Sequence, residues 1–375
     1  MRKPIRFPVW KLISFQTVLK HAHILGFLNG RPPPHQMKDT TMTERNPILI
    51  TGAGGQIGGV SRLMVDMLLE QGHSVRAFVR RDDERAQSLR AAGAEVFVGD
   101  LLKFADVAAA LKGVRRIYFS MSLSPYYADA LTLMAAAARA QGDIEAFVHM
   151  SDYEQVYMTL EKMTTPDEER RSWLGGLVTD WSPQQRAHWV CEQVLDWSGL
   201  PTVNVRATLF VENALITWMQ QGPLSNGELR LPFGNQRLAP IAAHDVAEVC
   251  VKILVDPAPH ISKSYELTGP ELKDMHGFAE DYAAALGREV TYIPEELDAW
   301  HEAFVNETFL RETLGDTAAQ HVAEHMRTLT RLVAGGRYDV VTDQLETLLG
   351  RPPRTMRWAL QNNAHMRELA VAPNQ

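Results

Sequence analysis

The sequence has little cysteine: only Cys191 and Cys250 occur in 375 residues. Both lie inside helix-like patterns, so the chain offers neither a disulfide framework nor the paired cysteines of a zinc site. Such sparse use of cysteine is typical of proteins in a reducing compartment. We therefore expect the protein in the cytoplasm.

An excess of basic charge is also missing. The chain has 38 Lys and Arg against 45 Asp and Glu, a formal net charge of −7, and no extended basic cluster beyond its N-terminal segment. This balance argues against an electrostatic grip on nucleic acid and favours a small-molecule ligand. What the chain has instead is 45% hydrophobic residues and eight Trp, enough to bury a sizeable core.

The N-terminal segment lacks acidic residues before Asp39 and contains a proline run at 32–34. It has neither the uninterrupted apolar stretch of a signal peptide nor the roughly 20 apolar residues of a spanning helix, so we expect no membrane partner. A basic leader also fits an organelle presequence, but Met42 is a natural start directly before the first strand. We interpret residues 1–45 as a disordered or mis-annotated extension, with a targeting segment as the alternative.

From Pro47 onward, strand and helix patterns alternate. Short runs rich in β-branched or aromatic residues predict strands at 48–50, 74–80, 94–99, 115–120, 146–151 and 202–206. Helical segments between them indicate βαβ units and hence an α/β fold with a doubly wound parallel sheet. After residue 210 the pattern loosens into helices with short strands. We predict a Rossmann domain at 46–210, to which some later segments return, and a smaller, mainly helical substrate lobe at 211–375.

The stretch ILITGAGGQIGG, residues 48–59, joins the first strand to the first helix through a G-x-x-G-x-x-G spacing at Gly52, Gly55 and Gly58. At such a junction the chain turns tightly, the backbone approaches a pyrophosphate and the helix packs close to its strand, and each demand excludes a side chain. The helix N-terminus supplies unpaired N–H groups and positive dipole for the phosphates. No Gly-Lys-Ser/Thr follows, which excludes a P-loop.

The residues at the end of the second strand indicate whether NAD or NADP is preferred. It reads FVRRDDE, with Arg80 and Arg81 first. Arginine accommodates the 2′-phosphate of NADP, whereas Asp82 in contact with the ribose keeps NAD(H) possible, so we predict a preference for NADP(H). After the third strand, Asp100 is placed to border the adenine, and capping of the next helix is the alternative.

The order of these motifs resembles the NmrA-like branch of the atypical short-chain dehydrogenase/reductases. The resemblance rests on TGAGGQIGG, VRAFVRR, VFVGDL, YELTGPE, LLGRPPRT and the segment LDWSGLPTVNVRATLFVEN, whose signature residues are Gly199, Arg206, Phe210, Glu212 and Asn213. It covers almost the whole chain from Pro47. It implies a Rossmann domain that binds NAD(P)(H), a substrate lobe, and activities from NADPH-dependent reduction of quinones, azo dyes or ketones to redox sensing through binding partners.

The resemblance also implies residues around the nicotinamide. Ser151 follows the fifth strand, where family members often place a pocket residue, although loop polarity explains it equally well. Some relatives carry Lys four residues before the Glu of the next helix, and counting back from Glu192 gives His188. A histidine facing the nicotinamide donates a proton near neutral pH, since its free pKa is roughly 6.5; a packed histidine is the alternative. The complete predicted cofactor set is Thr51, Gly52, Gly55, Gln56, Ile57, Gly58, Arg80, Arg81, Asp100 and Ser151.

The usual catalytic pair of short-chain dehydrogenases is absent. In that pair Lys stands four residues after Tyr, one helical turn away, where it lowers the pKa of the phenol. None of the nine tyrosines has Lys at this spacing, and Tyr157 with Lys162, five residues apart, is a chance approach.

Two other patterns invite a functional interpretation. HVAEH at residues 321–325 matches the H-x-x-E-H pattern of inverted zinc proteases, but we expect a solvated helix face there, and neither a metal nor a flavin in the protein. The tryptophans are expected to pack a helix on the sheet rather than to line an aromatic pocket; they are Trp181, Trp189, Trp197 and Trp218.

The leading hypothesis is therefore an NADPH-dependent reductase that passes hydride directly to a quinone-like, azo or carbonyl acceptor, with a proton from water or His188. The alternative is a non-catalytic sensor that changes its affinity for a protein partner with the NADPH/NADP ratio, and the missing Tyr/Lys pair favours it. An epimerase or dehydratase of nucleotide sugars also usually needs that pair and ranks third.

Overall fold

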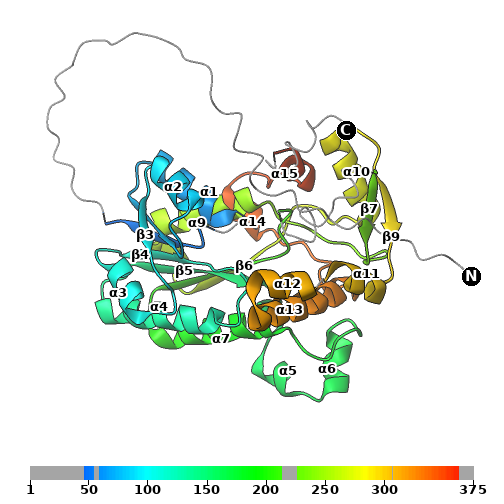
Figure 1. The fold of residues 1–375 in the computed structure, drawn as a ribbon, viewed down its shortest axis with the longest axis horizontal. Coiled ribbons are helices and arrows are strands. Elements are labelled where there is room, and N and C mark those ends of the chain that lie inside the picture. The colour runs from blue at the N-terminus through cyan, green and yellow to red at the C-terminus, as the bar shows by residue number, and fades with distance from the viewer. Residues whose placement is uncertain (1–45, 55–58, 213–225, 306, 363–375) are drawn as a thin grey trace, which may run out of the picture. The chain divides into compact units, whose positions relative to one another are not determined.

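The computed structural model describes residues 46–54, 59–212, 226–305 and 307–362 (Figure 1). The predicted extension at 1–45, the predicted contacts Gly55, Gln56, Ile57 and Gly58, and Asn213 and Trp218 lie outside the described residues. Within the described ranges, no helix combines the length and the apolar character needed to cross a bilayer.

A seven-stranded sheet forms the centre of the fold, and its neighbouring strands pair in parallel. In spatial order the strands are β3 (Glu95–Val98), β2 (Val75–Val79), β1 (Ile48–Thr51), β4 (Arg116–Phe119), β5 (Ala146–Asp152), β6 (Thr202–Ala207) and β8 (Lys263–Leu267). The predicted doubly wound α/β fold is confirmed. The strand order reverses between β1 and β4, and in doubly wound sheets ligands bind outside the carboxyl ends of the strands at such a switch point.

Helices cover both faces of this sheet (Figure 1). One face packs against α1 (Val60–Glu70), α2 (Glu84–Ala91), α9 (Ala243–Val255) and α14 (Gln344–Leu349). The other face packs against α3 (Phe104–Leu111), α4 (Tyr127–Gln141) and α7 (Pro183–Ser198). Burial on both faces explains why the strands read as continuous apolar runs rather than as alternating patterns.

A second apolar core lies beside the carboxyl ends of β5 and β6 and includes the buried rings of Tyr153, Trp181, Tyr282 and Trp300. Its strands β7 (Glu228–Leu231) and β9 (Thr291–Pro294) pair in parallel. The helices of this half are α10 (Met275–Leu286), α11 (Leu297–Phe304), α12 (Glu307–Leu314), α13 (Asp316–Ala334) and α15 (Met356–Asn362). The remaining short elements are η2 (Tyr153–Val156), α5 (Leu160–Thr164), α6 (Asp167–Trp173) and η4 (Ala258–His260).

The tryptophans do not lie where the sequence pattern predicts them. Trp181 is buried in the second core, where its indole N–H donates to Glu154 at 2.9 Å, and Trp189 packs against the same core. Trp197 leaves 76% of its surface exposed at the end of α7. For Trp181, Trp189 and Trp197 the expected packing on the sheet is wrong, because α7 turns its smaller apolar residues Cys191 and Leu195 toward the strands.

Candidate functional site

Thr51 ties the glycine-rich junction to the end of the neighbouring strand β4. Its side-chain hydroxyl donates to the carbonyl of Ser120 at 2.7 Å and accepts from the Ser120 N–H at 2.9 Å, which ties the end of β1 to the end of β4. The next residue, Gly52, has a φ of +77°, and a Cβ there would lie 2.9 Å from the Ser120 carbonyl oxygen and 3.0 Å from Ser61 Oγ. Both the backbone conformation and the space therefore require glycine.

The N-terminus of α1 faces this junction without a cap of its own. Its N-cap residue is Gly59, which has no side chain to cap the first N–H groups, and its first turn, Val60 onward, holds no acidic residue. By contrast, α2 begins with an Asp83 side chain that accepts from the N–H groups of Arg85 and Ala86, followed by Glu84. The start of α1 thus keeps its donors and its positive dipole for an external anion, and these residues fit the phosphates of a dinucleotide.

The two carboxylates after β2 are both held by arginines. Asp82 pairs with Arg90 at 2.6 Å, and Asp83 binds the Arg85 side chain, whose hydrogen bonds hold the Asp83 pKa below its usual range. Arg85 also donates to the Gly54 carbonyl at 2.8 Å, which connects the start of α2 to the glycine junction.

The two arginines that precede these carboxylates, unlike the carboxylates, have no partner among the described residues. Arg80 and Arg81 are exposed at the carboxyl end of β2, and neither makes an ion pair or a side-chain hydrogen bond with another described residue. Arg80 and Arg81 are thus available to an anion bound at the N-terminus of α1. Asp82, the carboxylate that would favour NAD, is instead paired with Arg90.

Asp100 is half-buried beyond β3 and is engaged within its own turn. Its side chain accepts from the Leu102 N–H at 3.0 Å, and its own N–H donates to Asp106 at 2.9 Å. The N-cap of α3 is Lys103, so Asp100 closes the turn before the helix instead of capping the helix itself. The structure places it at the carboxyl edge of the sheet, where a contact with adenine remains a prediction.

Ser151 is committed to a buried ion pair. Its hydroxyl donates to Glu192 at 2.6 Å, and the Arg206 guanidinium binds both oxygens of the same carboxylate at 3.1 and 2.5 Å. Ser151 and Glu192 are only 5% exposed, and this arrangement joins β5, α7 and β6 with only the Arg206 side chain partly exposed. The hydroxyl proton of Ser151 is therefore donated to another group of the protein. The placement of Ser151 in the nicotinamide pocket remains a prediction.

His188 lies on α7, a helix whose start is fixed by a capping box between Ser182 and Gln185. The imidazole is 9% exposed, and its centroid lies 4.5 Å from the Tyr127 ring and 5.6 Å from the His149 ring. Burial, helped by His149 and His325, holds its pKa well below 6.5. The expectation that this histidine titrates near neutral pH is wrong, because a charged imidazole in this apolar and aromatic setting would lose its hydration.

The HVAEH helix face is buried rather than solvated. His321 and His325 are 7% and 6% exposed and turn toward α7. His321 Nε2 lies 2.7 Å from Gln184 Oε1, and His325 Nδ1 lies 2.9 Å from Ser182 Oγ. The two histidines therefore bond to different residues of α7 and do not converge on a metal position, whereas Glu324 bonds to Gln320 at 3.0 Å.

Sequence reasoning missed Gln184 as a site residue. It is 1% exposed and stands four residues before His188, where the tyrosine of the usual Tyr/Lys pair would stand. Its amide contacts Ser124, His188 and His321 at 3.2, 3.1 and 2.7 Å. The spacing of four was visible in the sequence, but a Gln/His pair carries no catalytic signature by itself.

The near-miss pair Tyr157 and Lys162 does come into contact. Lys162 Nζ lies 5.8 Å from the centroid of the Tyr157 ring, and the Arg337 guanidinium covers the same ring at 3.8 Å. Both cations face the ring rather than the phenol oxygen. The pair therefore stabilises packing and does not reproduce the usual proton donor.

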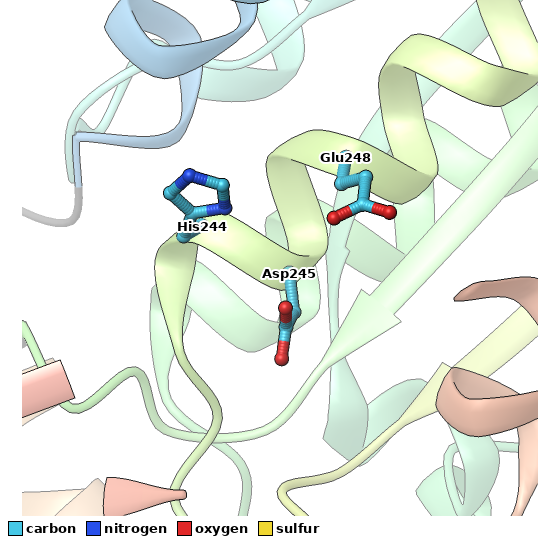
Figure 2. A group of neighbouring side chains, drawn as sticks. All are labelled: His244, Asp245 and Glu248. Carbon is cyan, nitrogen blue, oxygen red and sulfur yellow. The ribbon is translucent and has the colours of Figure 1, made fainter. Parts of the chain in front are cut away.

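Within the described ranges, three potential metal ligands come together on α9: His244, Asp245 and Glu248 (Figure 2). Arg351 binds Asp245 at 2.8 Å and Glu248 at 2.5 Å, and Arg354 contacts both carboxylates as well. The acidic groups are thus neutralised by two guanidinium groups, which fits an ion-pair cluster that anchors the segment before α15.

Comparisons with known proteins agree with this geometry. The model of the NAD(P)H-binding family matches residues 52–257. An NAD(P)H azoreductase of Xenophilus azovorans is 28% identical over 310 residues, which cover 82% of this chain and 94% of that protein. The uncharacterized oxidoreductase YesF of Bacillus subtilis is 25% identical over 323 residues, covering 84% and 94%.

Solved structures repeat the fold at low identity. The NADPH complex of the quinone oxidoreductase QOR2 from Escherichia coli has a TM-score of 0.62 and 22% identity, covering 83% of this chain and 97% of that one. NmrA, a negative transcriptional regulator, has a TM-score of 0.60 and 20% identity, covering 87% and 98%. The resemblance to the NmrA-like branch is confirmed.

Proposed function

The chain belongs to the NAD(P)H-binding family, and from this premise we propose that it is an NADPH-dependent reductase of a quinone-like, azo or carbonyl acceptor. The observation that carries the proposal is the N-terminus of α1, which no side chain of its N-cap residue caps, beside the point between β1 and β4 where the strand order reverses. Support for reduction comes from the azoreductase, which is similar over 94% of its own length.

The preference for NADPH over NADH rests on Arg80 and Arg81. Both are exposed at the end of β2, beside the anion site, and both lack partners among the described residues. A 2′-phosphate between them gains charge-assisted hydrogen bonds, whereas a bare ribose hydroxyl gains little. NADH remains a weaker second cofactor.

When bound, the dinucleotide supplies a hydride from its nicotinamide ring. The chain's own part is to hold the phosphates at Gly52 and α1, and to orient the reacting ring at the carboxyl ends of β4 and β5. The single proton that accompanies the hydride comes from water, because the lowered pKa of His188 keeps its imidazole neutral at pH 7.

A non-catalytic redox sensor is the competing proposal, favoured only by the missing Tyr/Lys pair. Steady-state oxidation of NADPH against a panel of quinones, azo dyes and aldehydes separates the two. The reductase proposal expects turnover with at least one acceptor class and a lower KM for NADPH than for NADH. Tight NADPH binding without turnover on any acceptor would leave the sensor.

A further inference from the structure

The contacts of Gln184 define which of its amide atoms is oxygen. The amide atom assigned as Oε1 lies 3.2 Å from the backbone nitrogen of Ser124 and 2.7 Å from His321 Nε2. A backbone N–H can only donate, so the atom that faces Ser124 must be an acceptor. The orientation of the Gln184 amide therefore follows from a donor whose role is fixed.

This orientation sets the proton on His188. The Gln184 nitrogen carries two hydrogens and no lone pair for hydrogen bonding, and it lies 3.1 Å from His188 Nε2. That ring nitrogen must therefore accept, and in a neutral imidazole the proton then sits on Nδ1. His321 completes the sequence of bonds, because it must donate its Nε2–H to the Gln184 oxygen.

The resulting Nδ1–H of His188 is buried and has no partner among the described residues. Its polar neighbours are engaged elsewhere: the Tyr127 hydroxyl donates to the Met150 carbonyl at 3.1 Å, and His149 Nδ1 bonds to Asn204 at 3.2 Å. His325 bonds to Ser182. A buried donor without a partner destabilises the folded protein, and a ligand with an acceptor atom at this position would recover that free energy.

We propose that Gln184 and His321 are positioning residues that hold His188 with its proton on Nδ1, so that His188 acts as a neutral hydrogen-bond donor to a bound ligand. This role rests on the proposed function and replaces proton transfer with polarisation of an acceptor oxygen or nitrogen. The acceptor atom belongs either to the dinucleotide or to the molecule being reduced. The residues that set the donor come from α7 and from α13, so the HVAEH segment serves the site without a metal.

The tautomer is measured on the ¹⁵N-labelled full-length protein without ligand, by two-bond ¹H–¹⁵N correlation of the histidine rings at neutral pH. His188 is assigned by loss of its signal in His188→Asn. The wild type is expected to show the proton on Nδ1. A proton on Nε2 would overturn the proposal, whatever the activity of the protein.

Gln184→Glu is the sharpest variant, because a carboxylate can only accept and must turn His188 Nε2 into a donor. The expected result is a switch of the His188 signal to the Nε2–H or doubly protonated form. His321→Leu should weaken the preference for Nδ1–H, and His321→Gln, which keeps a donor, should restore it. An unchanged His188 signal in Gln184→Glu would contradict the claim that Gln184 sets the tautomer of His188.

Ligand titrations identify the acceptor atom. A shift of the Nδ1–H signal with NADPH alone assigns it to the dinucleotide, and a shift only with NADP⁺ and a quinone together assigns it to the reduced molecule. No shift in either titration would overturn the donor role. In turnover, His188→Leu should lower kcat by about 10²-fold and His188→Asn, which retains an N–H near the Nδ1 position, by less than about 10-fold.

Discussion

The carboxyl end of β1 and the carboxyl end of β5 lie in the same sheet but prepare for ligands in opposite ways. At β1 the backbone is bare: Gly52 leaves no room for a side chain, α1 starts without a cap, and Arg80 and Arg81 stay uncommitted nearby. At β5 the side chains are already bonded to one another, as Ser151 is to Glu192. The first region leaves its donors and cations open to an anion, whereas the polar and charged groups of the second are already paired within the protein.

This contrast fits a division in which the β1 end binds the dinucleotide phosphates and the β5 end holds the reacting groups. Phosphates carry most of the charge of a dinucleotide, so free N–H groups and exposed arginines suit the β1 end. Reduction of an uncharged acceptor needs position more than free charge, so a buried network whose groups are already paired suits the chemistry proposed for the β5 end. Three substitutions and one change of pH test how the two regions differ in cofactor binding and stability, beginning with the largest expected effect.

Replacing Gly52 by Val should abolish measurable NADPH binding and lower stability. The substitution forces an L side chain into φ +77° and against the Ser120 carbonyl, 2.9 Å from the new Cβ. The matched control is Gly142→Val, since Gly142 has φ +87° but nothing within 4 Å of a Cβ. The control should cost only the backbone strain of about 1–2 kcal/mol and retain binding. Equal binding losses in calorimetric titrations of both variants would contradict the close approach.

Replacing Arg206 by Met should destabilise the fold by about 3–5 kcal/mol, because it leaves the buried Glu192 carboxylate without its cation. The side chain of Glu192 is only 6% exposed, so water compensates poorly for the lost guanidinium. Urea unfolding provides the measurement. Arg230→Met, which removes two partly solvated ion pairs, with Glu228 and Glu295, should cost about 1 kcal/mol or less for each pair. A loss for Arg206→Met no larger than that of Arg230→Met would show that the buried pair is not essential.

The double variant Arg80→Ala with Arg81→Ala should weaken NADPH binding by about 1.5–3 kcal/mol for each charge-assisted hydrogen bond to the 2′-phosphate that it removes. Binding of NADH should change little, because NADH carries no 2′-phosphate. Arg115→Ala removes an exposed arginine near the amino end of β4 and serves as the control. Parallel losses for NADPH and NADH would assign a purely structural role to the two arginines.

Acidification should destabilise the β5 region before it affects the β1 region. Burial lowers the pKa of both His149 and His325 from 6.5 to about 4. Between pH 6.5 and 4 the unfolded chain therefore binds protons that the folded chain refuses, and stability falls as the pH falls through this window. Above pH 6.5 both states are neutral and the effect vanishes. Hydrogen exchange at pH 7 and pH 5 should show earlier loss of protection in α7 and α13 than in α1, and uniform loss would contradict the prediction.

The sequence predicts the β1 region well and the β5 region poorly, for a physical reason. The glycine-rich junction has a local signature, since strand, turn and helix follow one another within a dozen residues, and the parallel strands show their own apolar pattern. The crowding of Gly52 by the Ser120 carbonyl is not part of that signature. The bond between Gln184 and His321 joins residues 137 positions apart. No periodicity of the sequence predicts such a long-range contact. The polar residues of HVAEH are therefore predicted to face solvent unless their hydrogen-bond partners are known.

The pKa of His188 illustrates the same limit. Its free value of roughly 6.5 follows from the residue type, but the lowered value depends on rings from β5, α4 and α13 that only the fold brings together.

Single-turnover oxidation of NADPH deuterated at the transferring C4 position tests the central claim most directly. With an excess of enzyme and a quinone or azo acceptor, direct hydride transfer predicts a primary isotope effect on the decay of NADPH absorbance. It also predicts little change in that rate between pH 6.5 and 8, since His188 remains neutral throughout. Stoichiometric NADPH binding with no oxidation by any acceptor would contradict the reductase account.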